Sequence, residues 1–221
     1  MSKEFREKDK MKCLLWCNRH CCLCGKSCGI DIELAHLPGK EDSDDIDDGI
    51  PVCSECHIKI GAYSSEHLKG TKYKPEELKV LREQVYEEYT RHLVPPIHFE
   101  LTQDLSGGGK RSLPDIGFKI IHLSNSLPVK ALVATQINLK DKCLKKLSDG
   151  GGHYGGKAFW RLNPRFGYVG HFSLPEEAVK SNEPLEITVH VTIVDQYERY
   201  HKLLPVSWAY DRKKNLWWSN P

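Results

Sequence analysis

The sequence has no hydrophobic run long enough to span a membrane, and its mean hydropathy is −0.50. Residues 1–10 are rich in charge and lack the apolar segment of a secretory signal. No segment of the chain repeats, which argues against a solenoid or a propeller built from sequence repeats. We therefore expect a cytoplasmic globular protein that does not associate with a membrane.

A large excess of positive charge is also missing. The chain of 221 residues has 32 Lys and Arg against 30 Asp and Glu, a net charge of +2. Residues 1–96 contain 15 of these basic and 18 of these acidic side chains, and residues 97–221 contain the remaining 17 and 12. Neither half has the dense basic surface of a protein that binds nucleic acid regardless of sequence. If the protein contacts DNA, we expect residues 97–221 to supply part of the attraction for phosphates.

Cysteine is scarce over most of the chain and concentrated near its start. Of the 9 cysteines, 8 lie within residues 13–56, and the ninth is Cys143. A disulfide-stabilised extracellular domain spreads its cysteines over the whole fold, whereas a cluster in a reducing cytoplasm is typical of metal binding. The distribution therefore favours a metal site in the first quarter of the chain.

Two Cys-x-x-Cys pairs lie within this cluster, Cys21 with Cys24 and Cys53 with Cys56. Each pair can present two sulfurs to one tetrahedral Zn²⁺, and four thiolates would close its coordination shell, which is typical of a structural zinc site. Cys22 is an alternative to Cys21, and four ordinary buried cysteines are an alternative to the zinc site. The remaining cysteines lack paired spacing and are expected to be core residues or free thiols: Cys13, Cys17, Cys28 and Cys143.

Residues 1–96 contain patterns for helices and for a short hairpin. The expected elements, in order, are a helix over 3–19, a strand over 30–36, an acidic loop over 37–49, a strand over 50–52, a helix from about residue 53, and a helix from Pro75 to Leu93. Pro95 and Pro96 end the last helix and predict a domain boundary.

After residue 96 the hydrophobic period changes to that of strands. Apolar and polar residues alternate over residues 116–120, 129–139, 185–193 and 206–210, with Gly and Pro turns between them and almost no helical pattern. Such strands are typical of an antiparallel β-sandwich. The sequence therefore predicts an α+β protein, with an N-terminal domain over residues 1–96 and an all-β, sandwich-like domain over residues 97–221.

The order of the cysteine pairs, a strand histidine and a helix histidine resembles the HNH endonuclease family. The resemblance covers roughly residues 11–93 and rests on residues 19–26, 32–36 and 47–57. It implies a zinc-containing ββα-metal module, in which a β-hairpin is crossed by a helix with one catalytic divalent metal between them. It also implies hydrolysis of phosphodiester bonds in DNA.

By the same resemblance, His36 is the general base that takes a proton from water, and Asp48 and His57 hold Mg²⁺ or another divalent cation. The implied cofactors are thus a structural Zn²⁺ and a catalytic divalent cation. The implied partner is double-stranded DNA, with a protein partner for residues 97–221 as a further expectation. Bacterial HNH proteins with an extra domain often act in defence against foreign DNA, so the resemblance extends to that role.

Two positions depart from the family pattern. Asp48 stands where Asn is usual, and a carboxylate coordinates a hard divalent ion at least as well. Ala35 stands where the family has a His or Asp ligand, and alanine coordinates nothing. Three explanations are open: a substitute ligand from the acidic loop (Asp44, Asp45 or Asp47), a loss of catalysis, or an engineered substitution.

Two hypotheses about function follow from these residues. The first is a metal-dependent DNA endonuclease whose β domain recruits substrate or partner. The second is a non-catalytic, zinc-stabilised module that binds nucleic acid or protein. In either case, candidates for stacking or pairing with nucleic acid in the second half are Trp160, Arg161, Arg165, Tyr168, Trp208, Tyr210, Trp217 and Trp218.

Overall fold

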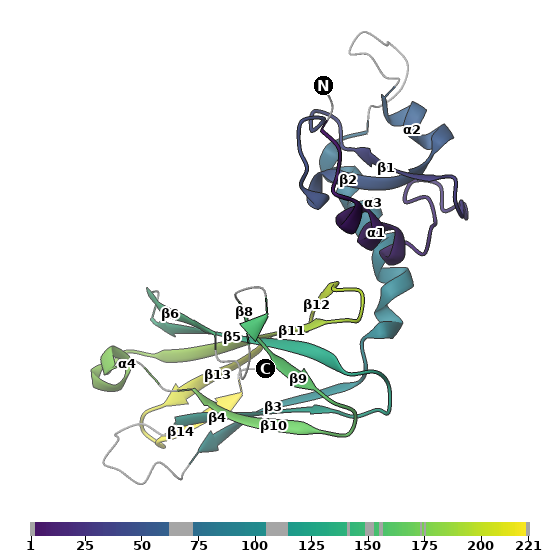
Figure 1. The fold of residues 1–221 in the computed structure, drawn as a ribbon. Helices are drawn as coiled ribbons and strands as arrows, with labels where there is room; N and C mark the ends of the chain where they lie inside the picture. The colour runs from purple at the N-terminus through teal and green to yellow at the C-terminus, as the bar shows by residue number, and fades with distance from the viewer. Residues whose placement is uncertain are drawn as a thin grey trace. The chain divides into compact units, whose positions relative to one another are not determined.

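The computed structural model describes residues 3–61, 73–104, 115–140, 142–148, 153–154, 157–172, 174 and 176–219. The chain divides into two compact units (Figure 1). The first, here called the N-terminal unit, comprises Met1–Leu93 and Tyr197–Arg199, and the second, the β unit, comprises Val94–Gln196 and Tyr200–Pro221. Within the described residues, no helix is both long and apolar enough to cross a membrane.

The N-terminal unit has a two-stranded antiparallel hairpin among its helices (Figure 1). Its elements are α1 (Glu7–Trp16), β1 (Ile32–His36), the 3-10 helix η1 (Ile46–Asp48), β2 (Gly49–Cys53), α2 (Ser54–Gly61), α3 (Pro75–Thr90) and the 3-10 helix η2 (Arg91–Leu93). In the hairpin, His36 pairs with Gly49 and Ile32 with Cys53. α1 is shorter than the predicted helix because Asn18 and Arg19 adopt positive φ angles just after it.

Helix α3 begins at Pro75, as predicted, and buries one face. The buried residues, spaced four apart, are Leu78, Arg82, Tyr86 and Thr90. Leu81, Val85 and Tyr89 are half-buried beside them. A buried arginine on the core-facing side requires polar partners, and the N-terminal unit supplies them near the hairpin, as described below.

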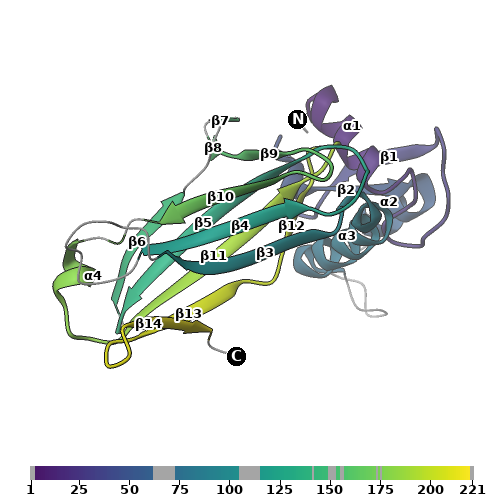
Figure 2. The ribbon, with the colours of Figure 1, turned by 90° about the horizontal axis from the view of Figure 1, so that it is seen from below.

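The β unit is built from antiparallel strands in two main sheets (Figure 2). Figure 2 shows β4 (Asp115–His122) between β3 (Ile97–Asp104) and β10 (Gly167–Phe172) in the smaller sheet. The larger sheet contains β5 (Val129–Leu139), β6 (Lys142–Ser148), β9 (Trp160–Leu162), β11 (Leu185–Val194), β12 (Tyr200–Lys202), β13 (Val206–Asp211) and β14 (Leu216–Ser219).

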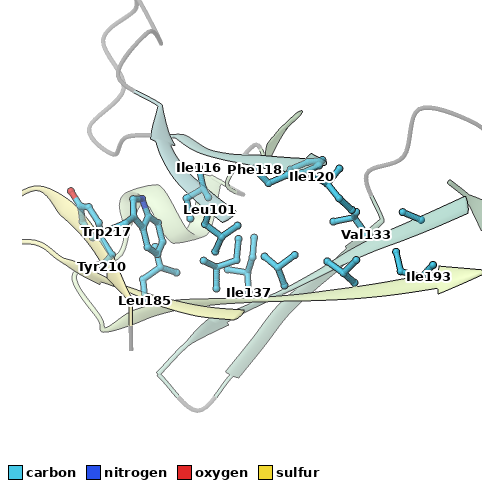
Figure 3. Packing of buried hydrophobic residues seen from close by; sticks show 14 of the residues in the cluster. Leu101, Ile116, Phe118, Ile120, Val133, Ile137, Leu185, Ile193, Tyr210 and Trp217 are labelled. Carbon is cyan, nitrogen blue, oxygen red and sulfur yellow. The ribbon is translucent and has the colours of Figure 1, made fainter. Parts of the chain in front are cut away.

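Hydrophobic side chains from both sheets share one core (Figure 3). Leu101, Phe118 and Ile120 come from the smaller sheet, and Ile137 and Leu185 from the larger one. β5 and β11 pair from Leu139↔Leu185 to Lys130↔Val194, and buried residues alternate along both strands. This alternation is the one that the sequence pattern predicted, because successive side chains of a strand point to opposite faces.

Two features of the β unit are absent from the sequence prediction. One is the short helix α4 (Glu176–Lys180). The other is the pair of two-residue strands β7 (His153–Tyr154) and β8 (Lys157–Ala158).

We expect the β unit to depend on the buried faces of β5 and β11. Val189→Ala should lower the free energy of unfolding by about 2 kcal/mol, because Val189 is fully buried and two methyl groups leave the core. Val169→Ala is the matched control: Val169 is 63% exposed on β10, and its cost should stay below about 0.5 kcal/mol. Urea unfolding followed by tryptophan fluorescence measures both, and equal losses would contradict this description of the core.

Candidate metal centre and adjacent histidine site

The four sulfur atoms of Cys21, Cys24, Cys53 and Cys56 all lie within 4.8 Å of one another. Two of them, the Sγ atoms of Cys24 and Cys53, are 3.9 Å apart. Tetrahedral geometry with a Zn–S distance of about 2.3 Å places neighbouring sulfurs about 3.8 Å apart. The cluster can therefore hold a metal ion such as zinc. In the described part of the chain it is the one group of three or more Cys, His, Asp or Glu ligands this close together.

Local backbone structure brings the two cysteine pairs together although 28 residues separate them. Gly25 has a φ of 72° and donates its backbone N–H to the carbonyl of Cys21 at 2.9 Å, which closes the first turn. The N–H of Cys22 donates to the carbonyl of Pro51 at 2.9 Å and attaches this turn to β2. Cys53 is the last residue of β2, and α2 begins directly after it.

The cluster's electrostatics fit a bound cation. Burial, together with the neighbouring thiols, raises the pKa of Cys56 above its ordinary range. Burial also opposes ionisation of Cys21, but backbone N–H groups of Cys53, Cys24 and Leu23 lower its pKa overall. Amide donors directed at sulfur stabilise a thiolate, and several thiolates at this spacing repel one another unless a cation lies between them.

The structure also distinguishes the other cysteines. Cys22 is buried outside the four-sulfur cluster, so Cys21 and not Cys22 completes the first pair. Cys13 and Cys17 are fully buried in the hydrophobic core of the N-terminal unit, Cys28 is half-buried, and Cys143 is exposed. Buried thiols of this kind behave as small hydrophobic side chains.

His36 lies at the end of β1, opposite Gly49. Its Nε2 is 3.0 Å from the carbonyl oxygen of Ser43, and its ring stacks on Phe5 with centroids 4.2 Å apart and planes 20° apart. A carbonyl oxygen only accepts hydrogen bonds, so Nε2 carries the proton in the neutral ring and Nδ1 is the nitrogen that can accept one. The two contacts hold the imidazole in one orientation.

His57 lies on the exposed side of α2, one residue after Cys56. Its Nδ1 is 2.7 Å from Oε2 of Glu33 on β1, and Ser54 donates its hydroxyl to the other carboxylate oxygen at 3.2 Å. The hydrogen bond from His57 lowers the pKa of Glu33. Sequence reasoning did not identify Glu33. The sequence feature that could have indicated Glu33 is the alternation of side chains along the strand, which puts residue 33 on the same face as residue 35.

Asp48 lies close to the end of β1 that carries His36. Its side chain contacts Lys79 and Ser43. Its backbone carbonyl accepts from the N–H of Leu37 at 2.8 Å, and its carboxylate is 3.4 Å from Nζ of Lys79. The hydroxyl of Ser43 is the main cause that lowers the pKa of Asp48, with Lys79 a further one. Ser43 thus contacts Asp48 through its side chain and His36 through its carbonyl.

Arg82 is the buried residue that connects α3 to the hairpin. Its guanidinium donates to the carbonyls of Gly49, Asp47 and Ile46 at 2.7, 3.0 and 3.4 Å. These bonds hold η1 and the first residue of β2, directly opposite His36 in the hairpin register. An arginine four residues after Leu78, within the apolar pattern of α3, was the sequence signal for this contact.

A hollow of about 340 Å³ lies beside the hairpin. Its charged and aromatic lining consists of His36, Phe5, the cationic side chains of Lys3 and Lys10, and the carboxylates of Glu4, Glu7 and Glu33. The hollow therefore combines an imidazole and two positive charges with three carboxylates. The carboxylates disfavour a phosphate group there unless a metal ion is present.

Most of the aromatic candidates in the β unit are not surface residues. Tyr210 and Trp217 are buried, and Trp160, Tyr168 and Trp208 are half-buried against the core. Trp218 is 46% exposed, and Arg161 and Arg165 are exposed. Tyr210 and Trp217 are therefore not available to stack with nucleic acid, because their rings fill the core between the sheets.

Comparisons with known proteins do not place the chain in a family. No family model and no curated protein matches the sequence. Among solved structures, the X-ray structure of Northeast Structural Genomics Consortium target SoR45 is 14% identical, with a TM-score of 0.31, and the match covers 50% of this chain and 84% of that one. A protein from Archaeoglobus fulgidus is 11% identical, with a TM-score of 0.32 and coverage of 51% and 94%. Likenesses this weak carry no argument about fold or function.

We expect the four-sulfur cluster to bind one zinc ion per chain. Cys53→Ser should abolish zinc binding and melt the N-terminal unit, because a structural zinc contributes about 10–16 kcal/mol of apparent binding free energy. Cys28→Ser is the matched control, since Cys28 is half-buried nearby but outside the cluster. Zinc content by atomic emission and helix content by circular dichroism measure both. A Cys53→Ser protein that keeps its zinc would contradict the assignment.

Proposed function

We propose that the N-terminal unit is a metal-dependent endonuclease that hydrolyses phosphodiester bonds of DNA, on a zinc-stabilised ββα module of the HNH type. The observation that supports it is that the cysteine cluster joins the hairpin that carries His36 to the helix that carries His57. Cys53 ends β2, which pairs with the strand of His36, and Cys56 lies on α2 beside His57. Zinc at this cluster would set the geometry between strand and helix, and hence between the two imidazoles.

His36 acts as the general base in this proposal. The carbonyl of Ser43 accepts from Nε2, so Nδ1 takes the proton from the attacking water. The stacked ring of Phe5 restricts rotation of the imidazole, which keeps Nδ1 in place during the reaction. Positioning of this kind matters because phosphodiester hydrolysis depends mainly on orientation and charge neutralisation.

His57 contributes to holding the catalytic divalent cation, and Asp48 was predicted to do so from the sequence. When bound, the cation supplies Lewis-acid polarisation of the scissile phosphate. In the structure Asp48 contacts Lys79 and Ser43, so its carboxylate supports the segment that contacts His36. Lys3 and Lys10 line the hollow beside His36, where they offset part of the negative charge of its three glutamates.

The β unit is proposed to recruit substrate or a protein partner. The support is the excess of basic over acidic residues after residue 96 and the exposure of Trp218, Arg161 and Arg165. Cleavage of double-stranded DNA in the cytoplasm, in defence of a bacterial cell, is the biological setting that the HNH resemblance favours.

One observation favours the alternative of a non-catalytic, zinc-stabilised binding module. Ala35 is 2% exposed on β1 and pairs with Ile50, so the side chain where the HNH family has a metal ligand is a buried methyl group. A module that keeps the zinc cluster and has lost its catalytic cation would still bind nucleic acid or protein.

Cleavage of supercoiled plasmid separates the two functions. We expect nicking by the full chain in Mg²⁺, Mn²⁺ or Ni²⁺, and a loss of about 100-fold or more in rate for His36→Ala, the usual contribution of a general base. His20→Ala is the control: His20 belongs to the same unit but stacks on Tyr89, and its rate should change less than about twofold. Failure of the unaltered protein to nick DNA in any of the three metals would support the binding module instead.

A further inference from the structure

We propose that Glu33 and His57 together form the divalent-cation site of the N-terminal unit, with Glu33 supplying the ligand that Ala35 cannot. The two side chains come from different elements, β1 and α2, and meet with Oε2 of Glu33 2.7 Å from Nδ1 of His57. One carboxylate oxygen and one imidazole nitrogen at this distance can both reach a single cation after a small rotation of either side chain.

Strand geometry explains why residue 33 can replace residue 35. Side chains two residues apart on a strand point to the same face, so Glu33 lies on the face where a ligand at position 35 would start. The side chain of Ala35 is a single buried methyl group. The glutamate side chain is three bonds longer than that methyl group, and in the structure it reaches the helix histidine.

The exposure of the pair suits a catalytic cation better than a structural ion. The side chains of Glu33 and His57 are 50% and 48% exposed, so water and a phosphate oxygen can take the remaining coordination positions. Glu33 also lines the hollow that contains His36. A cation at the pair would offset the negative charge of Glu33 toward a phosphate.

The acidic loop is the rival source of a substitute ligand, and its carboxylates have other partners. Asp44 forms an ion pair with Lys3 at 3.0 Å, Asp45 caps η1 by accepting from the N–H of Asp47 at 3.0 Å, and Asp47 is 3.5 Å from Arg82. These contacts support the loop itself. None of the interactions described for the three carboxylates joins them to His57, whereas Glu33 contacts it directly.

A titration of the zinc-loaded full chain with Mn²⁺, with free Mn²⁺ measured by electron paramagnetic resonance, tests the site. We expect Glu33→Gln and His57→Ala each to weaken Mn²⁺ binding at least about tenfold. Asp44→Asn and Asp45→Asn are the matched controls and should leave the Kd within about twofold. Zinc content of every variant is measured in parallel, so that loss of the fold is recognised.

Glu33→Gln is chosen because the amide oxygen can still accept the hydrogen bond from Nδ1 of His57. If Glu33 only orients His57, the Gln variant keeps its Mn²⁺ affinity while His57→Ala loses it, and the inference is overturned. It is overturned as well if Asp44→Asn or Asp45→Asn weakens binding more than Glu33→Gln does.

The catalytic role of the Glu33–His57 cation site rests on the proposed function. The Mn²⁺ titration contains no DNA, so its result is independent of turnover. Mn²⁺ binding that depends on Glu33 and His57, in a protein that does not nick plasmid, would reject the endonuclease and keep the cation site. Nicking by the unaltered protein, with unchanged Mn²⁺ affinity in Glu33→Gln, would reject the cation site and keep the endonuclease.

Discussion

The approach of four cysteine sulfurs is the interaction on which the N-terminal unit depends. Six of the 14 buried residues in its core cluster are cysteines, and three of these belong to the four-sulfur cluster. A structural zinc contributes its binding free energy directly to the stability of such a unit. A metal at this cluster would join the turn before β1, the end of β2 and the start of α2. The same bonds that stabilise the unit therefore also orient the elements that carry His36, Glu33 and His57.

How much the sequence could predict depends on whether a feature is local. The Cys-x-x-Cys pairs, the start of α3 at Pro75 and the alternation along β5 and β11 are local patterns, and the structure confirms them. Spacing alone left Cys21 and Cys22 as alternatives. Burial and distance separate them, because only Cys21 contributes to the four-sulfur cluster.

The features that sequence reasoning missed are contacts between distant segments. Phe5 stacks on His36 across 31 residues, Arg82 donates to Gly49 across 33, and Glu33 meets His57 across 24. Phe5 and Arg82 lie outside the segments on which the HNH resemblance rests, and Glu33 lies inside them without a role that the resemblance implies. The aromatic residues of the β unit show the converse case: their chemistry suits nucleic-acid stacking, but Tyr210 and Trp217 fill the core. Composition identifies such residue types, but tertiary packing decides whether their side chains lie in the core or at the surface.

We expect one metal cluster to position a separate, exposed cation site on the same hairpin and helix. Anomalous diffraction from crystals soaked in Mn²⁺, recorded at the zinc and manganese absorption edges, tests it most directly. We expect a zinc peak among Cys21, Cys24, Cys53 and Cys56, and a manganese peak between Glu33 and His57. A manganese peak in the acidic loop, or the absence of zinc from the cysteine cluster, would contradict it.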